Sequence, residues 1–260
     1  MVAGGTDVIV RADPDIRSLV DITRLGLNYI RRKGDGWAIG ATTLMAEIEA
    51  STAMRGLAGG ILAKAAAACG SVQMRNMATV GGNLANASPA ADMATPLLVL
   101  DAAVMAAGPR SRRKVALLDL FCIPGKTVLG KALIVEVILP AQPRGGRTGW
   151  SYQKLGRTES DISLVNVAAG MQLDAKGRCR WARIALGAVA PTPVRARSAE
   201  GLLAGRKLDQ SLIERACAEV AREVSPITDI RATADYRREM SRVLAMRALE
   251  ECAARAGCSL

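Results

Sequence analysis

The pattern of hydrophobic and polar positions along the chain predicts short strands and helices in its first half. Two short apolar segments, 27–32 and 37–41, flank the sequence Lys-Gly-Asp-Gly, which predicts a hairpin. The Ala-rich run at 59–69 leads into Gly70, a residue that commonly ends a helix. We therefore expect a helix there and a loop over residues 73–83.

Further short elements follow in the first half. They are a helix from Thr43, a helical turn from Pro96, a buried strand at 102–107, and apolar segments at 115–120 and 132–139. The basic run 110–114 is expected to be a solvated turn. Pro140, Pro143 and the Gly145-Gly146 pair then interrupt the pattern, so we predict two domains, residues 1–145 and 146–260.

The second half begins with a strong hairpin signal. Two apolar runs, 163–173 and 179–189, are joined by Asp-Ala-Lys-Gly at 174–177. After Pro191 and Pro193 the pattern becomes helical. Its clearest helix is predicted to bury one set of side chains and to expose another; the buried set is Tyr236, Met240, Val243 and Leu244, and the exposed set is Arg237, Arg238, Glu239 and Arg242. This unit is expected to be a sheet with helices on one side.

The amino-acid composition limits the chemistry that the chain can perform. Aromatic residues make up 3% of the sequence, so the core must consist mainly of aliphatic side chains. Histidine is absent, which removes the commonest general base and transition-metal ligand. The six cysteines are scattered without a C-x-x-C pair, so no zinc or iron–sulfur site is expected. We predict no metal site and no catalytic side chain, and expect chemistry to come from a bound cofactor.

The net charge of +11 is compatible with nucleic acid, with an acidic partner subunit or with phosphate groups. The basic residues are dispersed and are not interleaved with aromatics, so nucleic-acid binding is not expected. No apolar run approaches the roughly 18 to 20 residues of a transmembrane helix, and no secretory signal is present. These features predict a cytoplasmic protein.

Two glycine pairs are the candidate binding elements. The first lies in AGGTD at residues 3–7 and the second in TVGGN at residues 79–83. Glycine permits a sharp turn and lets a ligand reach the backbone N–H groups, and several such groups in a turn form an anion-binding concavity. A single glycine pair is more often a simple turn. Two pairs flanked by Thr, Asp and Asn are better support for a pyrophosphate site, although neither has the Rossmann or P-loop spacing.

Four segments carry a family resemblance: AGGTD at 3–7, IGATT at 39–43, TVGGNLANASPAAD at 79–92 and DYRREMSRVLAMRAL at 235–249. With them the chain resembles the medium, FAD-binding subunit of molybdenum hydroxylases of the xanthine dehydrogenase and carbon monoxide dehydrogenase type. The resemblance implies an α+β fold. It consists of a two-part FAD-binding domain of the vanillyl-alcohol oxidase/PCMH type, followed by a C-terminal domain with a three-stranded antiparallel sheet and helices.

The resemblance also implies which residues contact FAD. The two glycine segments would surround the pyrophosphate, Asp92 would bind the nucleotide end, Ile134 would contact the flavin through its backbone, and Lys154 would be the basic residue of the YQKLGR segment. Gln153 is the alternative to Lys154 if the register differs by one residue. The implied FAD-binding residues are Ala3, Gly4, Gly5, Thr6, Asp7, Thr79, Val80, Gly81, Gly82, Asn83, Asp92, Ile134 and Lys154.

The implied function is electron transfer. The flavin would receive electrons from [2Fe-2S] clusters of a small subunit and pass them to NAD, a quinone or oxygen, while a large molybdopterin subunit hydroxylates the substrate. A dimer of heterotrimers is implied. A flavin-free scaffold subunit and a stand-alone FAD oxidoreductase are the alternatives. Family members carry a strand and a helix before the first glycine segment, so this chain is expected to lack that segment and to leave a sheet edge uncovered there.

Overall fold

The computed structural model describes residues 1–11, 13–143 and 146–260. Local sequence signals start several of its helices. The side chains of Ser71, Thr79, Asp209 and Thr233 each accept a hydrogen bond from a backbone N–H in the first turn of the helix that follows. The hairpin predicted at 174–177 is confirmed, because Asp174 accepts hydrogen bonds from two backbone N–H groups in the turn.

The first half of the chain forms a five-stranded antiparallel sheet in the order β1-β2-β7-β3-β4. Its strands are β1 (Ile30–Lys33), β2 (Gly36–Gly40), β3 (Ala103–Ala107), β4 (Arg112–Ala116) and β7 (Leu133–Leu139). The predicted hairpin of β1 and β2 is confirmed, and so are the strands at 102–107 and 132–139. The basic run 110–114 is exposed as predicted, but β4 begins within it at Arg112, so it is not simply a turn.

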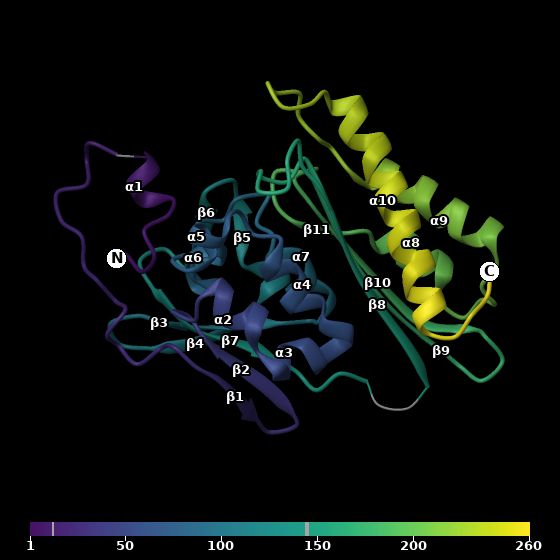
Figure 1. The fold of residues 1–260 in the computed structure, drawn as a ribbon, viewed down its shortest axis with the longest axis horizontal. Coiled ribbons are helices and arrows are strands. Elements are labelled where there is room, and N and C mark those ends of the chain that lie inside the picture. The colour runs from purple at the N-terminus through teal and green to yellow at the C-terminus, as the bar shows by residue number, and fades with distance from the viewer. Residues whose placement is uncertain (12, 144–145) are drawn as a thin grey trace.

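Short helices cover one face of this sheet, as Figure 1 shows. They are α2 (Met45–Ala50), α3 (Thr52–Gly56), the 3-10 turn Leu57–Gly60, α4 (Ile61–Ala67), α5 (Val72–Arg75), α6 (Val80–Ala85) and α7 (Ala94–Val99). Helix α1 (Val8–Arg11) lies apart from the sheet and contains no buried residue. A second 3-10 turn, Leu117–Asp119, precedes the small hairpin of β5 (Phe121–Ile123) and β6 (Lys126–Thr127). The expectation of a loop over 73–83 is therefore wrong. Two short helices, α5 and α6, occupy most of it.

The second half forms a four-stranded antiparallel sheet in the order β11-β10-β9-β8. The strands are β8 (Arg147–Leu155), β9 (Val165–Leu173), β10 (Cys179–Gly187) and the two-residue β11 (Val194–Arg195). They are followed by α8 (Arg197–Leu203), α9 (Gln210–Glu223) and α10 (Ala234–Arg255). Three long strands thus match the predicted sheet, and β11 adds a short fourth.

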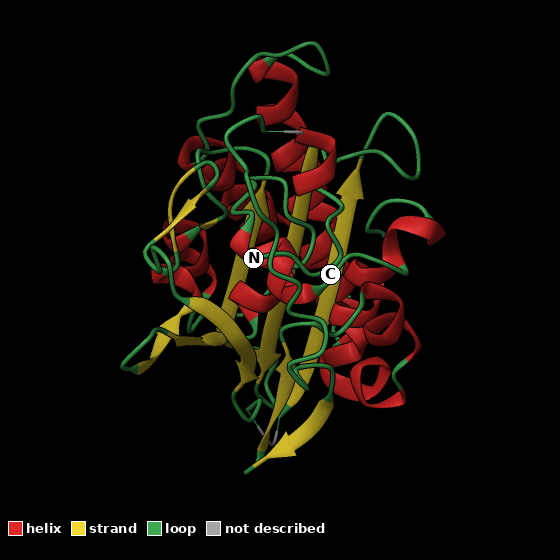
Figure 2. Ribbon diagram, turned by 90° about the vertical axis from the view of Figure 1, so that its left-hand side faces the viewer, coloured by secondary structure: helices red, strands yellow, loops and turns green. Residues whose placement is uncertain are grey.

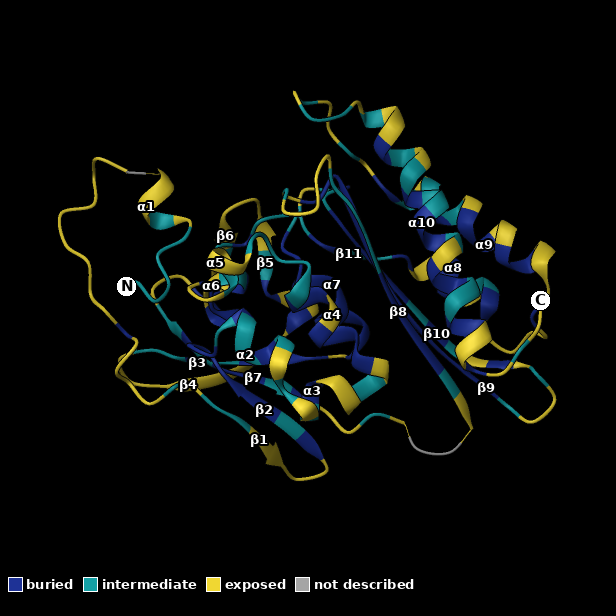
Figure 3. Ribbon diagram, in the orientation of Figure 1, coloured by how far each residue is buried: buried dark blue, intermediate teal, exposed yellow. Residues whose placement is uncertain are grey.

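The second sheet is covered on both faces, which differs from the prediction of helices on one side. Helix α10 packs on β8 and β9, while α7 of the first half packs on β9 and β10. In Figure 2 helices flank the long strands on both sides. Every residue of β9 is buried, as Figure 3 shows. The buried apolar side chains of the first half form one hydrophobic core, the first hydrophobic core, and this sheet contributes four residues to it: Trp150, Tyr152, Ala168 and Ala185. The two halves are therefore packed into one body.

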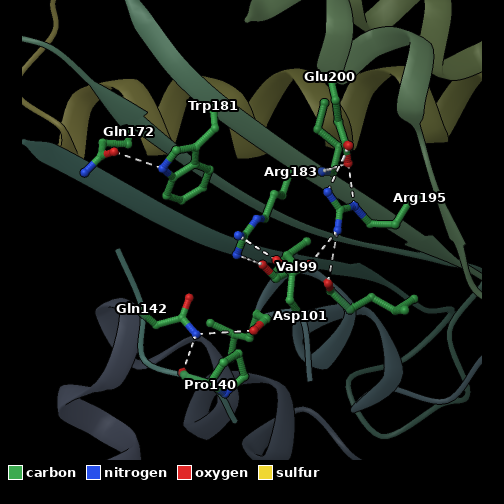
Figure 4. Close-up of polar contacts among 12 residues, drawn as sticks. Val99, Asp101, Pro140, Gln142, Gln172, Trp181, Arg183, Arg195 and Glu200 are labelled. Carbon is green, nitrogen blue, oxygen red and sulfur yellow. Dashed lines mark hydrogen bonds and ion pairs between the residues drawn. The ribbon is translucent and has the colours of Figure 1, made fainter. Parts of the chain in front are cut away.

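Charged residues reinforce this contact between the halves (Figure 4). Arg183 on β10 donates to the Val99 carbonyl at 3.0 Å and lies 2.6 Å from the Asp101 carboxylate. Arg195 on β11 pairs with both Asp101 and the buried Glu200. Burial lowers the pKa of Arg183, although the Asp101 carboxylate opposes that shift. The end of α7 is thus held by two arginines of the second sheet.

Helix α10 buries only part of the predicted face: Leu244 is buried and Met240 packs against the core, as predicted, but Tyr236 and Arg237 are exchanged. Tyr236 is 46% exposed, whereas Arg237 is only 3% exposed. Arg237 donates to the carbonyls of Leu164 and Ala188 and pairs with Asp229 at 2.8 Å, so both terminal nitrogens of this buried guanidinium have partners. Its Nε atom has no hydrogen-bond partner among the described residues. No helix in the described ranges is long and apolar enough to cross a membrane.

The segment between the first glycine pair and β1 is mostly exposed (Figure 3). It includes apolar side chains: Ile9 is 66% exposed and Val10 is 81% exposed. Val2 forms a parallel bridge with Asp21, which holds the middle of this segment beside residue 2. The predicted domain boundary falls at residues 144–145, which lie outside the described residues.

Candidate FAD site

The first glycine segment, residues 3–7, is a loop with unused backbone donors. Gly5 has a φ of +69°, a conformation that glycine adopts without strain. The N–H groups of residues 3–7 donate no hydrogen bond to any other described residue. Several adjacent N–H groups without partners form a binding site for an anion such as a pyrophosphate. The loop therefore has backbone donors that a phosphate group could use.

Gly4 brings the first segment against the second. A Cβ atom at Gly4 would lie 1.8 Å from the Met77 carbonyl oxygen, so the close contact with residues 77–78 requires glycine. Residues 77–78 directly precede the second glycine segment. Together the two segments line one cavity of about 350 Å³, which we call the glycine-loop cavity.

The glycine-loop cavity contains most of the predicted residues of both segments. Its lining includes Ala3, Gly4, Gly5, Thr6, Asp7, Thr79, Gly82 and Asn83. It also includes residues that the sequence analysis did not single out, among them Cys69, Met74, Asn86 and Gly125. Cys69, Met74 and Gly125 lie outside the quoted motifs, and Asn86 lies within the segment 79–92 but was not assigned a role.

The second glycine segment is helical and its backbone donors are already used. The N–H groups of Val80 and Gly81 donate to the carbonyls of Thr43 and Ala41, at 3.0 and 2.9 Å. Those of Gly82 and Asn83 donate to the side chain and the carbonyl of Thr79. The segment is the first turn of α6, and its N–H groups do not form the open concavity expected from sequence.

Gly81 and Val80 therefore have a packing role, whereas Asn83 offers a polar group to a ligand. A Cβ atom at Gly81 would lie 2.7 Å from the Ala41 side chain, and Val80 is fully buried. The Oδ1 atom of Asn83 is buried and has no hydrogen-bond partner in the described chain. A buried acceptor without a partner is costly unless a ligand or water supplies a donor. A ribityl or ribose hydroxyl meets that need.

Asp92 lies in a buried cluster at the contact between the two halves. Its Oδ1 accepts hydrogen bonds from Tyr152 at 2.9 Å and Ser163 at 2.8 Å, and its Oδ2 pairs with Lys154 at 2.9 Å. Burial and the neighbouring Asp92 carboxylate raise the pKa of Tyr152 well above its usual value, so its hydroxyl stays a donor. Both oxygens of Asp92 thus have protein partners, and the carboxylate lines neither of the cavities described here.

Lys154 lies at the edge of a second cavity of about 860 Å³, which we call the lysine cavity. Its ammonium group donates to the Ala68 carbonyl at 2.6 Å and to Asp92, which leaves one of its three N–H donors without a partner among the described residues. Gln153 lies on the opposite face of β8, where it donates to Ser151 and Glu251. The geometry therefore favours Lys154 over Gln153.

Ile134 lies away from both cavities. Its side chain is buried in the first hydrophobic core, and its strand β7 pairs with β3 through Ala106. Its implied contact with the flavin is a backbone contact, which side-chain burial does not test. Among the described residues, no group of three or more His, Cys, Asp or Glu side chains could hold a metal ion.

The arrangement fits FAD. The first loop has N–H groups available for phosphate oxygens, glycine backbones line the cavity, and Asn83 has an acceptor available for a hydroxyl. Cys69 lies in the same lining, and burial raises the pKa of its thiol to about 11, so it is a neutral wall residue at neutral pH. The side chains around the cavity can bind and orient a dinucleotide, but they form no metal or nucleophile constellation of their own.

Comparisons with known proteins show which family the chain resembles. Residues 1–142 match the family model described as "FAD binding domain in molybdopterin dehydrogenase", and residues 150–252 match the "CO dehydrogenase flavoprotein C-terminal domain". The chain is 33% identical to the xanthine dehydrogenase FAD-binding subunit of Escherichia coli O157:H7, over 99% of this chain and 89% of that one. It is 32% identical to the glyceraldehyde dehydrogenase medium chain of Sulfolobus acidocaldarius, over 96% and 89%.

The fold agrees as well. The carbon monoxide dehydrogenase structure from Hydrogenophaga pseudoflava superposes with a TM-score of 0.91 at 31% identity, covering 99% of this chain and 90% of that one. Quinoline 2-oxidoreductase from Pseudomonas putida 86 gives a TM-score of 0.88 at 26% identity, covering 98% and 89%. These relatives confirm the two-part α+β fold. The chain belongs to the family of FAD-binding medium subunits of molybdenum-containing dehydrogenases.

Proposed function

We propose that this chain is the FAD-carrying electron-transfer subunit of a molybdenum hydroxylase complex. It would receive electrons from [2Fe-2S] clusters of a small partner subunit and deliver them to NAD, a quinone or oxygen. A large molybdopterin-binding subunit would hydroxylate the substrate. We further propose a dimer of heterotrimers in the cytoplasm, a reducing compartment that suits the free state of all six cysteines.

One observation carries this proposal: two distant segments meet in one cavity that combines unused backbone donors with the unpartnered Asn83 acceptor. Bound FAD would supply the redox chemistry there, because flavins exchange electrons both singly and in pairs. The protein's own groups bind and orient. The first loop would hold the pyrophosphate, Asn83 would accept a hydrogen bond from a hydroxyl, and Gly82 would keep the approach open.

For the remaining implied contacts we propose two roles. Ile134 would contribute its backbone to the flavin, and Lys154 would contribute its unpaired N–H. Asp92 would act through Lys154, since both of its oxygens already have protein donors.

The test is the flavin content of the complex purified from its source. We expect a visible flavin absorbance and FAD released on denaturation. Gly82→Val should remove the flavin without unfolding the chain, because a branched side chain would enter the cavity beside Thr79. Gly201→Val in α8, where an added Cβ meets no atom within 4 Å, is the matched control and should keep its flavin.

The contrary outcomes are distinct. A complex that contains no flavin would indicate a scaffold subunit. A chain that oxidises a small molecule alone, with no iron–sulfur or molybdenum partner co-purifying, would indicate a stand-alone flavin enzyme.

A further inference from the structure

The glycine-loop cavity is too small to enclose a whole FAD molecule. Its volume of about 350 Å³ is at the lower end of the roughly 300 to 1,000 Å³ found for pockets that enclose drug-sized ligands. FAD, a dinucleotide with a three-ring head, is larger than such ligands. With its pyrophosphate at the glycine segments, the molecule must continue beyond this cavity.

The lysine cavity adjoins the glycine-loop cavity across one short segment. Cys69 and Met74 line the glycine-loop cavity, while Ala68, Gly70 and Arg75 line the lysine cavity, so residues 68–75 form a wall common to both. The two cavities therefore lie next to each other, on either side of this one segment. The volume of about 860 Å³ is ample for a flavin ring.

At this wall the protein holds one ammonium group in a fixed position. The Lys154 side chain is only 9% exposed, and its ammonium is bound to the Ala68 carbonyl and to Asp92. Its remaining N–H has no partner among the described residues. A buried, charged donor acts strongly on a neighbouring charge, because little water screens it.

Two hydroxyl groups fix the carboxylate that holds this ammonium. Tyr152 and Ser163 both donate to Oδ1 of Asp92, and Tyr152 is itself 8% exposed. Loss of either hydroxyl would remove one of the two donors to this oxygen, and would loosen the carboxylate and the ammonium group that it holds.

We propose that Tyr152 and Ser163 are positioning residues for the redox chemistry of the flavin, because through Asp92 they hold the Lys154 ammonium beside the flavin ring in the lysine cavity. This inference rests on the proposed function. Two electrons and one proton convert a neutral flavin ring into a reduced ring with one negative charge. A positive donor next to the ring stabilises the reduced form relative to the oxidised form and raises the reduction potential.

The experiment measures the midpoint potential of FAD in the purified complex, following the flavin absorbance during a reductive titration. Lys154→Met should lower the ratio of reduced to oxidised flavin at least tenfold, which is about 30 mV for a two-electron couple. Tyr152→Phe and Ser163→Ala should lower it in the same direction by a smaller factor, with normal FAD content. Lys154→Arg should retain a potential close to that of the unmodified protein.

The chain contains a matched control for Tyr152. Tyr29 also donates to a carboxylate, Glu136, at 2.9 Å, and that carboxylate also pairs with a lysine, Lys33. This second cluster lines neither cavity. Tyr29→Phe should therefore leave the potential unchanged, although it removes the same kind of hydrogen bond.

An unchanged potential in Lys154→Met, or a Tyr152→Phe shift no larger than that of Tyr29→Phe, would overturn the inference. If Lys154→Met does not retain FAD, its affinities for oxidised and reduced FAD are measured separately by titration. An equal loss of both affinities would also overturn the inference. A complex that contains no flavin at all would refute the proposed function itself, which is a different result.

Discussion

The Asp92–Lys154 pair gives the sharpest test of how the two halves are joined. Asp92→Ala leaves the ammonium group of Lys154, a side chain that is only 9% exposed, with the Ala68 carbonyl as its one remaining acceptor. It also removes the acceptor of the Tyr152 and Ser163 hydroxyls. Removing one partner of a buried ion pair costs about 3 to 5 kcal/mol, because an uncompensated charge remains. We expect a loss of that size in the free energy of unfolding of the full chain at pH 7.

The assay is urea unfolding of the FAD-free chain, so that differences in FAD affinity among the variants do not contribute. Lys154→Met alone should cost less, because Asp92 keeps two hydroxyl donors. In the double variant no unpaired ammonium group remains. Its free energy of unfolding should therefore fall by about 2 kcal/mol less than the sum of the two single losses. Losses that add to within about 0.5 kcal/mol would refute the view that these side chains act as a pair.

Three further outcomes follow from the described contacts. Gly4→Ala should weaken FAD binding by at least tenfold in a fluorescence titration, because its methyl group would lie 1.8 Å from the Met77 carbonyl oxygen and push the two glycine segments apart. An unchanged affinity would show that the contact between these segments is not needed for FAD binding. Burial alone would raise the pKa of Glu136, but hydrogen bonds from Lys33 and Tyr29 lower it. The stability that this group contributes is therefore present above its unfolded pKa of about 4.3 and is lost as pH falls through the lower folded value, so Glu136→Gln should flatten acid unfolding below that pH. With its pKa near 11, Cys69 should be alkylated roughly a hundredfold more slowly at pH 8 than an ordinary thiol, and bound FAD should slow the alkylation further. Mass spectrometry of the labelled protein measures the alkylation rate.

The elements that sequence predicted correctly are those fixed by neighbouring residues. The turn at 174–177 forms because Asp174 binds the backbone of its own turn and Gly177 accepts a φ of +76°. The first glycine segment is similar, since its glycines and unused donors lie within five residues. Such signals lie within a few neighbouring residues, so a single sequence is enough to predict these turns.

The elements that sequence missed depend on distant partners. Two glycines disfavour a helix at 79–83, yet α6 forms there because the carbonyls of Thr43 and Ala41 accept the first two N–H groups of its first turn. Arg237 has the polarity of a surface residue, and it is buried because two carbonyls and Asp229 meet it inside the fold. Ser163 shows the same limit at the candidate site, since nothing near it in sequence indicates a contact with Asp92.

The strand β9, buried along its whole length between α7 of the first half and α10 of the second, determines how the chain can fold during synthesis. Its two neighbours β8 and β10 supply Trp150, Tyr152 and Ala185 to the core of the first half. When the ribosome has released only that first half, its core still lacks one wall and its apolar surface is exposed. The FAD domain is therefore completed only after β10 has emerged, and an isolated fragment that ends before β8 should require a chaperone to remain in solution.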